Sequence, residues 1–224
     1  MPSQAVENYV KEILLAQQRL GGGSVPMGSV AKALEVTPGT ATAMLKSLAQ
    51  AGLADYEPRH GARLTEKGRQ LALKMLRKHR IVELFLVEEL GLDWSQVHVE
   101  AERMEHAVSE LVLEKMDARL GHPTTDPHGD PIPTAEGDID VEPLHTLADC
   151  PCETDYLIAR VGDQSAEFLN YMNDRALHPG SSISVGSRNT VADAVTVATA
   201  DGKSFTMGLK AAGKIFVRMP DKPA

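Results

Sequence analysis

The spacing of apolar side chains changes along the chain and divides it into three parts. Over residues 1–120 they recur every three or four positions, which is typical of amphipathic helices. From residue 141 onward they recur mostly at every second position, which is typical of strands. Residues 121–140 are rich in Pro, Gly and Asp and are expected to form a loop. The pattern predicts a mainly α protein with a small β domain, divided at 1–65, 66–140 and 141–224.

The first part has the order helix, helix, short turn, helix and β-ribbon. Thr37 is a good N-cap, and Pro38 suits the first position of a helix, where its missing N–H has no partner. The turn Pro58–Gly61 separates two strand-like segments. The predicted elements are a first helix with its apolar face at 6–14 and its end at Gly21, helices at 27–34 and 38–50, and strands at 53–57 and 62–65. This order is typical of a winged helix-turn-helix.

The outward face of the third helix carries small and hydroxyl-bearing residues, which allow close approach to the edges of bases and to phosphates. Basic side chains in the turn of the β-ribbon are placed to meet the backbone or the minor groove. The predicted DNA-contacting residues are Thr37, Gly39, Thr40, Thr42, Lys46, Arg59 and Arg63. The net charge is −8, but residues 1–80 hold 12 Lys/Arg against 6 Asp/Glu, which favours a polyanion at this end. A small structural or protein-binding module is the alternative interpretation.

The second part is predicted to form two longer helices, one over about 66–90 and one from about 93 through 111. The later helix carries an apolar stripe that is typical of packing against another helix or subunit. His98, Glu102, Glu105 and His106 run beside this stripe, and the earlier helix places His79 and Glu83 one turn apart. Such imidazoles and carboxylates can hold one or two divalent cations, and the absence of a thiolate suits Mn(II) or Fe(II). Ion pairs, one of them to Arg103, are the alternative interpretation.

These features together resemble the diphtheria-toxin-repressor and manganese-transport-regulator family of metal-dependent transcription factors, over nearly the whole chain. The resemblance rests on the winged helix and on three segments: MLRKHRIVELFL at 75–86, GLDWSQVHVEAERMEHAVS at 91–109 and HPTTDPHGDPIP at 122–133. It implies a homodimer that binds palindromic double-stranded DNA, two metal ions per subunit, and repression of metal-uptake genes when metal is bound.

The resemblance also implies a role for each candidate ligand. His79, Glu83 and His98 match the ancillary metal site of the family, and Glu102, Glu105 and His106 match the primary site. Glu102 stands where iron-type members carry a cysteine, which favours manganese. Asn8 stands where a methionine or aspartate completes the primary site, and Lys11 stands where manganese-type members have a glutamate. Ala43 replaces a glutamine of the third helix, so the family's base preference does not carry over.

The third part resembles the SH3-like, FeoA-like domain that ends the longer members of the family, and we expect a small β-barrel. In those members this domain lends oxygen ligands to the ancillary metal, which makes Asp163 the first candidate and Glu167 the second. Cys150 and Cys152 have no second pair at zinc spacing. Two cysteines are also too few for a disulfide framework, which fits a reducing compartment.

We therefore expect a cytoplasmic, metal-activated DNA-binding regulator that is not an enzyme. No apolar run approaches the roughly 20 residues that cross a bilayer. Paired helical Glu-x-x-His motifs, a His-Glu-x-x-His motif, a nucleophile triad and a Gly-rich phosphate loop are all absent from the sequence. Two alternatives stay open: a winged-helix regulator that senses an organic ligand and has a structural His/Glu cluster, and a helix-bundle metalloenzyme.

Overall fold

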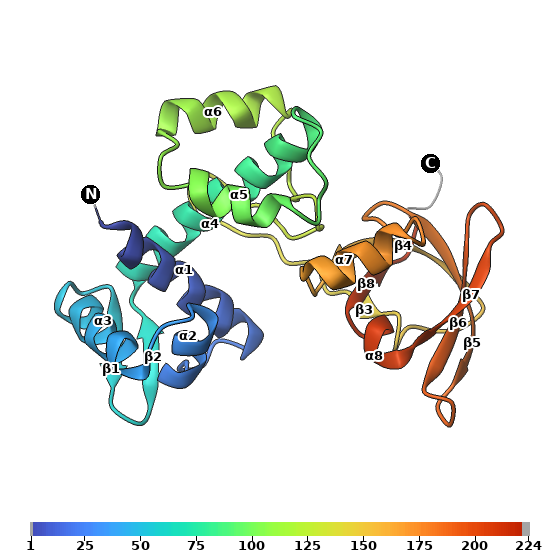
Figure 1. The fold of residues 1–224 in the computed structure, drawn as a ribbon, viewed down its shortest axis with the longest axis horizontal. Helices are drawn as coiled ribbons and strands as arrows, with labels where there is room; N and C mark the ends of the chain where they lie inside the picture. Colours follow the sequence, from blue (N-terminus) through green and yellow to red (C-terminus); the bar gives the residue numbers. More distant parts are fainter. Residues whose placement is uncertain (1, 221–224) are drawn as a thin grey trace. The chain divides into compact units, whose positions relative to one another are not determined.

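The structure is a computed structural model that describes residues 2–220 (Figure 1). The chain divides into two compact units, each built from segments that are discontinuous in sequence. The first unit contains Met1–His79, Met104–Ser109 and Pro133–Ile139, and the second contains Arg80–Arg103, Glu110–Ile132 and Asp140–Ala224. Each unit has its own buried apolar core.

The first unit has the predicted winged helix-turn-helix order. Its elements are α1 (Gln4–Arg19), α2 (Met27–Ala33), α3 (Pro38–Gln50), β1 (Ala54–Glu57) and β2 (Gly61–Leu64). The strands β1 and β2 pair antiparallel. As predicted, Thr37 is the N-cap of α3, and its hydroxyl oxygen accepts from the Thr40 amide at 3.2 Å. Ile13, Leu45 and Leu48 are fully buried in the core that joins these helices.

Helix α4 (Glu66–Glu88) contributes to both units, because the boundary between them falls after His79. Gly68 lies where α4 passes the end of the wing. A Cβ atom there would lie 1.8 Å from the carbonyl oxygen of Leu53, so only glycine allows this close approach. Within residues 2–220, no helix is both long enough and apolar enough to cross a membrane.

The prediction of a single helix from about 93 through 111 is wrong. The chain instead forms α5 (Val97–Met104) and α6 (Glu110–Arg119), separated by a turn. The amides of Ala107 and Val108 both donate to the carbonyl of Met104, and Lys78 Nζ donates to the carbonyl of Val108 at 3.0 Å. These tertiary and turn bonds replace the next helical turn, so Leu111 is 65% exposed rather than part of a continuous apolar stripe.

The carboxy-terminal part of the second unit is an antiparallel sheet with two short helices. Its elements are β3 (His145–Thr146), β4 (Thr154–Val161), α7 (Ala166–Asn173), β5 (Ser182–Asn189), β6 (Ala194–Thr199), β7 (Ser204–Gly208), α8 (Leu209–Ala212) and β8 (Ile215–Arg218). The strand order is β3-β8-β4-β5-β6-β7. Figure 1 shows the sheet curling, with α7 and α8 beside it.

The overall fold class is confirmed, with one difference in the sheet. The expected β-barrel is open, because β3 and β7 are edge strands that do not pair with each other in residues 2–220. The edge strand β3 has only two residues, which is too short to extend the hydrogen-bonding ladder around to β7. Tyr156, Ile158 and Met172 fill the core of this sheet.

Candidate metal centre and nucleic-acid interface

Glu105 is the centre of a buried polar cluster in the first unit. Its side chain is 0% exposed, its Oε1 accepts from Lys11 Nζ at 2.6 Å, and its Oε2 lies 2.6 Å from His79 Nδ1. Burial alone would raise the pKa of the Glu105 carboxyl, but the hydrogen bond and charge of His79 and the Lys11 ammonium outweigh burial and lower it. The carboxylate is therefore ionised at neutral pH, although it is completely enclosed.

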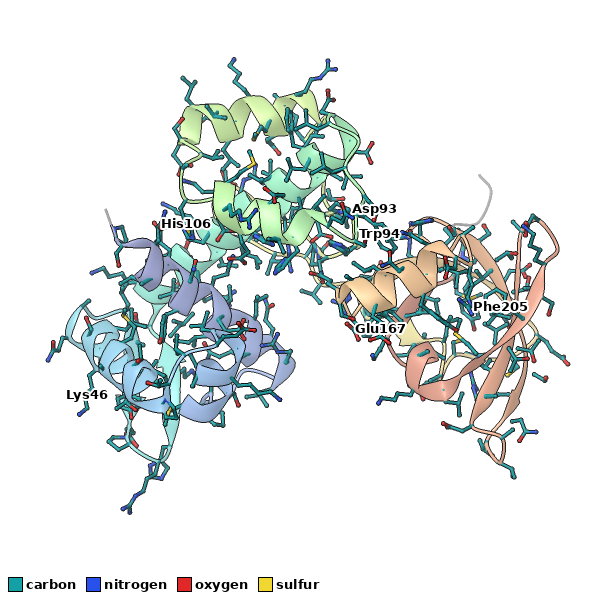
Figure 2. The ribbon with its side chains drawn as sticks, viewed as in Figure 1. Lys46, Asp93, Trp94, His106, Glu167 and Phe205 are labelled. Carbon is teal, nitrogen blue, oxygen red and sulfur yellow. The ribbon has the colours of Figure 1, made fainter. Side chains whose placement is uncertain are left out.

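His106 follows Glu105 and lies beside α1 (Figure 2). Its Nδ1 is 2.7 Å from Glu7 Oε2. A carboxylate can only accept, so we assign the proton of His106 to Nδ1, which leaves a lone pair on Nε2. A histidine held in this way is the usual form of a metal ligand. Glu7 was not predicted from the sequence, where its position one turn before Lys11 was the available signal.

Three buried atoms, in the first half of α1 and in the turn after α5, have no hydrogen-bond partner among the described residues. They are Asn8 Oδ1, Tyr9 Oη and His106 Nε2. His106 Nε2 lies 3.5 Å from Glu105 Oε1. An unsatisfied buried acceptor costs about 1–3 kcal/mol, and a cation satisfies such atoms. Glu105 and His106 therefore form a donor pair that fits a divalent cation, and Asn8 carries a further oxygen acceptor without a partner.

Further candidate ligands lie in the second unit. Glu83 is buried, and its Oε1 lies 3.1 Å from His98 Nδ1. His98 Nε2 lies 3.9 Å from Glu102 Oε1, one turn further along α5. His79 precedes Glu83 by one turn of the continuous helix α4, as the sequence predicted. The structure thus brings Glu83, His98 and Glu102 together as imidazole and carboxylate donors.

The loop between α6 and the sheet adds two residues that the sequence analysis missed. Asp126 and His128 are buried, and their ligand atoms and those of Glu83 all lie within 4.8 Å of one another. His128 Nε2 lies 3.0 Å from the carbonyl of Trp94, which places the ring proton there, and its buried Nδ1 has no hydrogen-bond partner among the described residues. The signal for Asp126 and His128 was the sequence Asp-Pro-His in the loop, which shows neither helical nor strand periodicity.

Charge is concentrated around this loop. Arg80 Nε lies 3.6 Å from Asp126 Oδ2, and the amides of His128 and Asp130 donate to Asp126 Oδ1. Burial and the neighbouring carboxylates of Asp130 and Glu83 raise the pKa of Asp126 well above its usual value, and Arg80 opposes this rise. The carboxylates of Asp126, Asp130 and Glu83 therefore lie close together beside the Arg80 guanidinium.

Asp163 and Glu167, the predicted contributions of the SH3-like domain, have different surroundings. Asp163 Oδ2 accepts from Lys214 Nζ at 2.5 Å. Burial acts to raise the pKa of Asp163, but Lys214 and the hydrogen bonds from Ser165 lower it overall. Glu167 is exposed in the first turn of α7 (Figure 2). The neighbouring Gln164 reaches the loop instead, and its Nε2 donates to Asp130 Oδ2 at 2.8 Å. The role of Asp163 stays a prediction.

The outward face of α3 is accessible, as a DNA-reading helix requires. Gly39, Thr40 and Lys46 are exposed, and Figure 2 shows Lys46 on this helix. The Thr42 hydroxyl donates to the Pro38 carbonyl at 2.8 Å. On the wing, the side chains of Arg59 and Arg63 are exposed. The predicted contacts are thus at the surface of one unit, on α3 and on the adjacent wing.

Family models match nearly the whole chain. The N-terminal DNA-binding domain of iron-dependent repressors matches residues 1–62, their metal-binding and dimerisation domain matches residues 65–134, and the FeoA domain matches residues 145–219. An uncharacterized HTH-type transcriptional regulator of Methanocaldococcus jannaschii is 40% identical over 114 residues, which cover 51% of this chain and 90% of that protein. The chain belongs to the diphtheria-toxin-repressor family. The resemblance inferred from the sequence is confirmed.

Other members of the diphtheria-toxin-repressor family match over different lengths. The iron-dependent repressor IdeR of Mycobacterium tuberculosis is 40% identical over 128 residues, which cover 57% of this chain and only 54% of IdeR, about half its length. A solved manganese-dependent transcriptional repressor in complex with manganese is 36% identical with a TM-score of 0.86, covering 95% of this chain and 99% of that one. Members of this family are DNA-binding repressors rather than enzymes.

Proposed function

We propose that this protein is a cytosolic, metal-dependent transcriptional repressor that binds DNA when Mn(II) or Fe(II) is bound. The observation that carries the proposal is the contact of α1, a helix of the DNA-binding domain, with candidate metal ligands. Glu7 holds His106, and Lys11 holds Glu105. A cation bound at these ligands changes the contacts of α1, and only such differential binding can shift the population of DNA-binding conformers.

The proposed ligands form two sets, and we expect two ions per subunit. The first set is His79, Glu83 and His98, with Asp163 as a further oxygen donor. The second set is Asn8, Glu102, Glu105 and His106. Imidazole nitrogen and carboxylate oxygen suit Mn(II) and Fe(II). The hydrogen bond between Glu7 and His106 supports the second set.

We propose that the DNA partner is a palindromic operator bound by a homodimer. Residues 1–65 would form the DNA-binding domain, 66–140 the metal-binding and dimerisation domain, and 141–224 the SH3-like domain. The two recognition helices of a dimer then meet half-sites about 34 Å apart, one turn of DNA. Phosphate contacts should dominate the affinity, so binding should weaken steeply with salt. We infer that the regulated genes include those for metal uptake.

The test is DNA binding by the full chain with and without metal. Operators are first selected from random duplexes with Mn(II)-loaded protein, and affinities are then measured by fluorescence anisotropy after chelation and after addition of Mn(II), Fe(II) or Zn(II). We expect at least a tenfold gain in affinity with Mn(II) or Fe(II). Equal binding by chelated protein would contradict the proposal and favour a regulator that senses an organic ligand. Substrate turnover without DNA binding would favour a metalloenzyme.

A further inference from the structure

Lys11 occupies an unusual place for a lysine. Its side chain is 7% exposed, and its Nζ lies 2.6 Å from Glu105 Oε1 and 3.5 Å from His79 Nδ1. Lysines are almost never this buried unless they are paired. The ammonium therefore already provides a positive charge to the carboxylate that the proposed function assigns to a divalent ion.

Both oxygens of Glu105 are engaged in the structure. Oε2 lies 2.6 Å from His79 Nδ1, and Oε1, which accepts from Lys11, also lies 3.5 Å from His106 Nε2. An ion bound jointly by Glu105 and His106 would approach this same Oε1. Because a divalent ion and an ammonium repel each other strongly in a buried site, they do not share one carboxylate oxygen.

Glu7 and Asn8 lie on the same helix as Lys11, and each bears on a candidate ligand atom. Glu7 orients His106 so that Nε2 can act as a ligand, and Asn8 Oδ1 is a buried acceptor without a hydrogen-bond partner among the described residues. Asn8 and Lys11 are three residues apart on α1, so they lie on neighbouring turns of one helix face. One helix therefore carries both a candidate ligand for the ion and a cation that competes with it.

We propose that Lys11 is an internal competitor for the ion of the second ligand set, and that this ion binds in exchange for the Lys11–Glu105 ion pair. The proposal rests on the proposed metal-dependent function. The Lys11 ammonium moves from Glu105 to solvent or to another acceptor when the ion binds. Lys11 thereby raises the metal concentration at which this set is filled, and α1 changes its contacts in the same step.

The test compares Lys11→Met with wild type in the full chain. Protein is stripped with a chelator and titrated with Mn(II), with bound ions counted from the free Mn(II) signal in electron paramagnetic resonance and affinities taken from calorimetry. Lys74→Met is the matched control, because Lys74 is exposed on α4 and its loss changes the net charge equally. We expect Lys11→Met to tighten one of two Mn(II) ions at least tenfold, with Lys74→Met close to wild type. Unchanged or weaker binding by Lys11→Met would overturn the proposal.

A measurement on wild-type protein covers the case in which Lys11→Met fails to fold. Reductive methylation read by mass spectrometry reports the accessibility of each lysine, with Lys74 as the internal reference. We expect Lys11 to be protected in chelated protein and labelled at least fivefold faster at saturating Mn(II). Continued protection of Lys11 with two ions bound would overturn the proposal that Lys11 competes with the ion, and would leave the proposed function standing. Binding of no Mn(II) by wild type would overturn the proposed function as well.

Discussion

Glu7 is the side chain that best distinguishes a metal-binding His106 from a merely packed one. Its carboxylate accepts from His106 Nδ1 at 2.7 Å and so directs Nε2 toward Glu105. Partners of this kind, which fix the ring of a ligating histidine, typically contribute about 10–100-fold to metal affinity. Glu7 is therefore a positioning residue whose effect should be measurable in the absence of DNA.

We expect Glu7→Gln to weaken binding of one Mn(II) ion by about 10–100-fold, since an amide oxygen is a poorer acceptor for Nδ1–H. Calorimetry on stripped protein measures this effect. Glu12→Gln, on the same helix but paired with Arg19, is the matched control and should bind both ions as wild type does. Identical Mn(II) affinities in Glu7→Gln and Glu12→Gln would show that Glu7 does not position His106.

Arg63 is exposed on β2 and is expected to contact phosphate rather than a base edge. Arg63→Ala should weaken binding to all operator variants by a similar factor and reduce the slope of log affinity against log salt by about 1. Anisotropy titrations at several salt concentrations measure both quantities. A loss confined to one base position would instead assign Arg63 to base recognition. Arg103→Ala, exposed on α5, serves as the charge-matched control.

The packing of helix α4 against the segment that leads into the wing depends on a close backbone contact between Gly68 and Leu53. Gly68→Ala would place a methyl group 1.8 Å from the Leu53 carbonyl oxygen, so α4 and the wing would have to separate. We expect a loss of about 1–3 kcal/mol in the free energy of unfolding, as for other overpacked sites. Gly28→Ala is the control, because Gly28 lies in α2 with nothing within 4 Å of an added Cβ. Urea unfolding followed by circular dichroism should separate the two variants, and equal stabilities would contradict the packing described here.

Helix α7 and the segment before α5 meet at Trp94, the single tryptophan of the chain. Its indole Nε1 donates to Asn173 Oδ1 at 2.5 Å, and its ring lies 4.9 Å from that of His178. Burial lowers the pKa of His178, and the charge of Asp93 partly opposes this. The folded state therefore takes up a proton less readily at His178 than the unfolded chain does.

This contact predicts a pH dependence. Because the unfolded chain binds more protons at His178 between the lowered pKa and the usual value of about 6.5, the free energy of unfolding should fall as the pH drops from 7 to 5. Urea unfolding followed by Trp94 fluorescence measures it. His178→Gln should flatten this dependence, whereas His60→Gln, exposed on the wing, should not. An unchanged slope in His178→Gln would show that another group is responsible.

At the scale of the whole molecule, the features that could be predicted from the sequence are those that depend on contacts between residues close together in the chain. The winged helix followed from the Thr37 cap, from Pro38 and from the apolar spacing, all of which act within a few residues. The break after Met104 was not predicted, because the turn depends on Lys78, which is 30 residues away in sequence. The partners of Glu105 likewise come from distant segments, α1 and α4, that no periodicity connects.

The loop of residues 121–132 shows the same limit. Its Asp-Pro-His sequence served only as a mark of the family, and the closeness of Asp126 and His128 to Glu83 became visible only in the folded chain. Helical spacing pointed to the histidine and glutamate ligands of α4 and α5 and of the turn that follows, and the family resemblance added Asn8 and Asp163. The contacts that each of these side chains makes could not be predicted. Glu7, Lys11 and Gln164 were therefore the residues whose contacts added most to the account.

The most direct test of the account is anomalous X-ray scattering at the manganese edge from crystals of the full chain grown with Mn(II). We predict one anomalous peak within bonding distance of Glu105 and His106 Nε2, and a second at His79, Glu83 and His98. Ligand distances of about 2.0–2.4 Å are expected for such donors. Crystals that contain bound Mn(II) elsewhere, but show no peak at either ligand set, would contradict the claim that these side chains hold the ion that controls DNA binding.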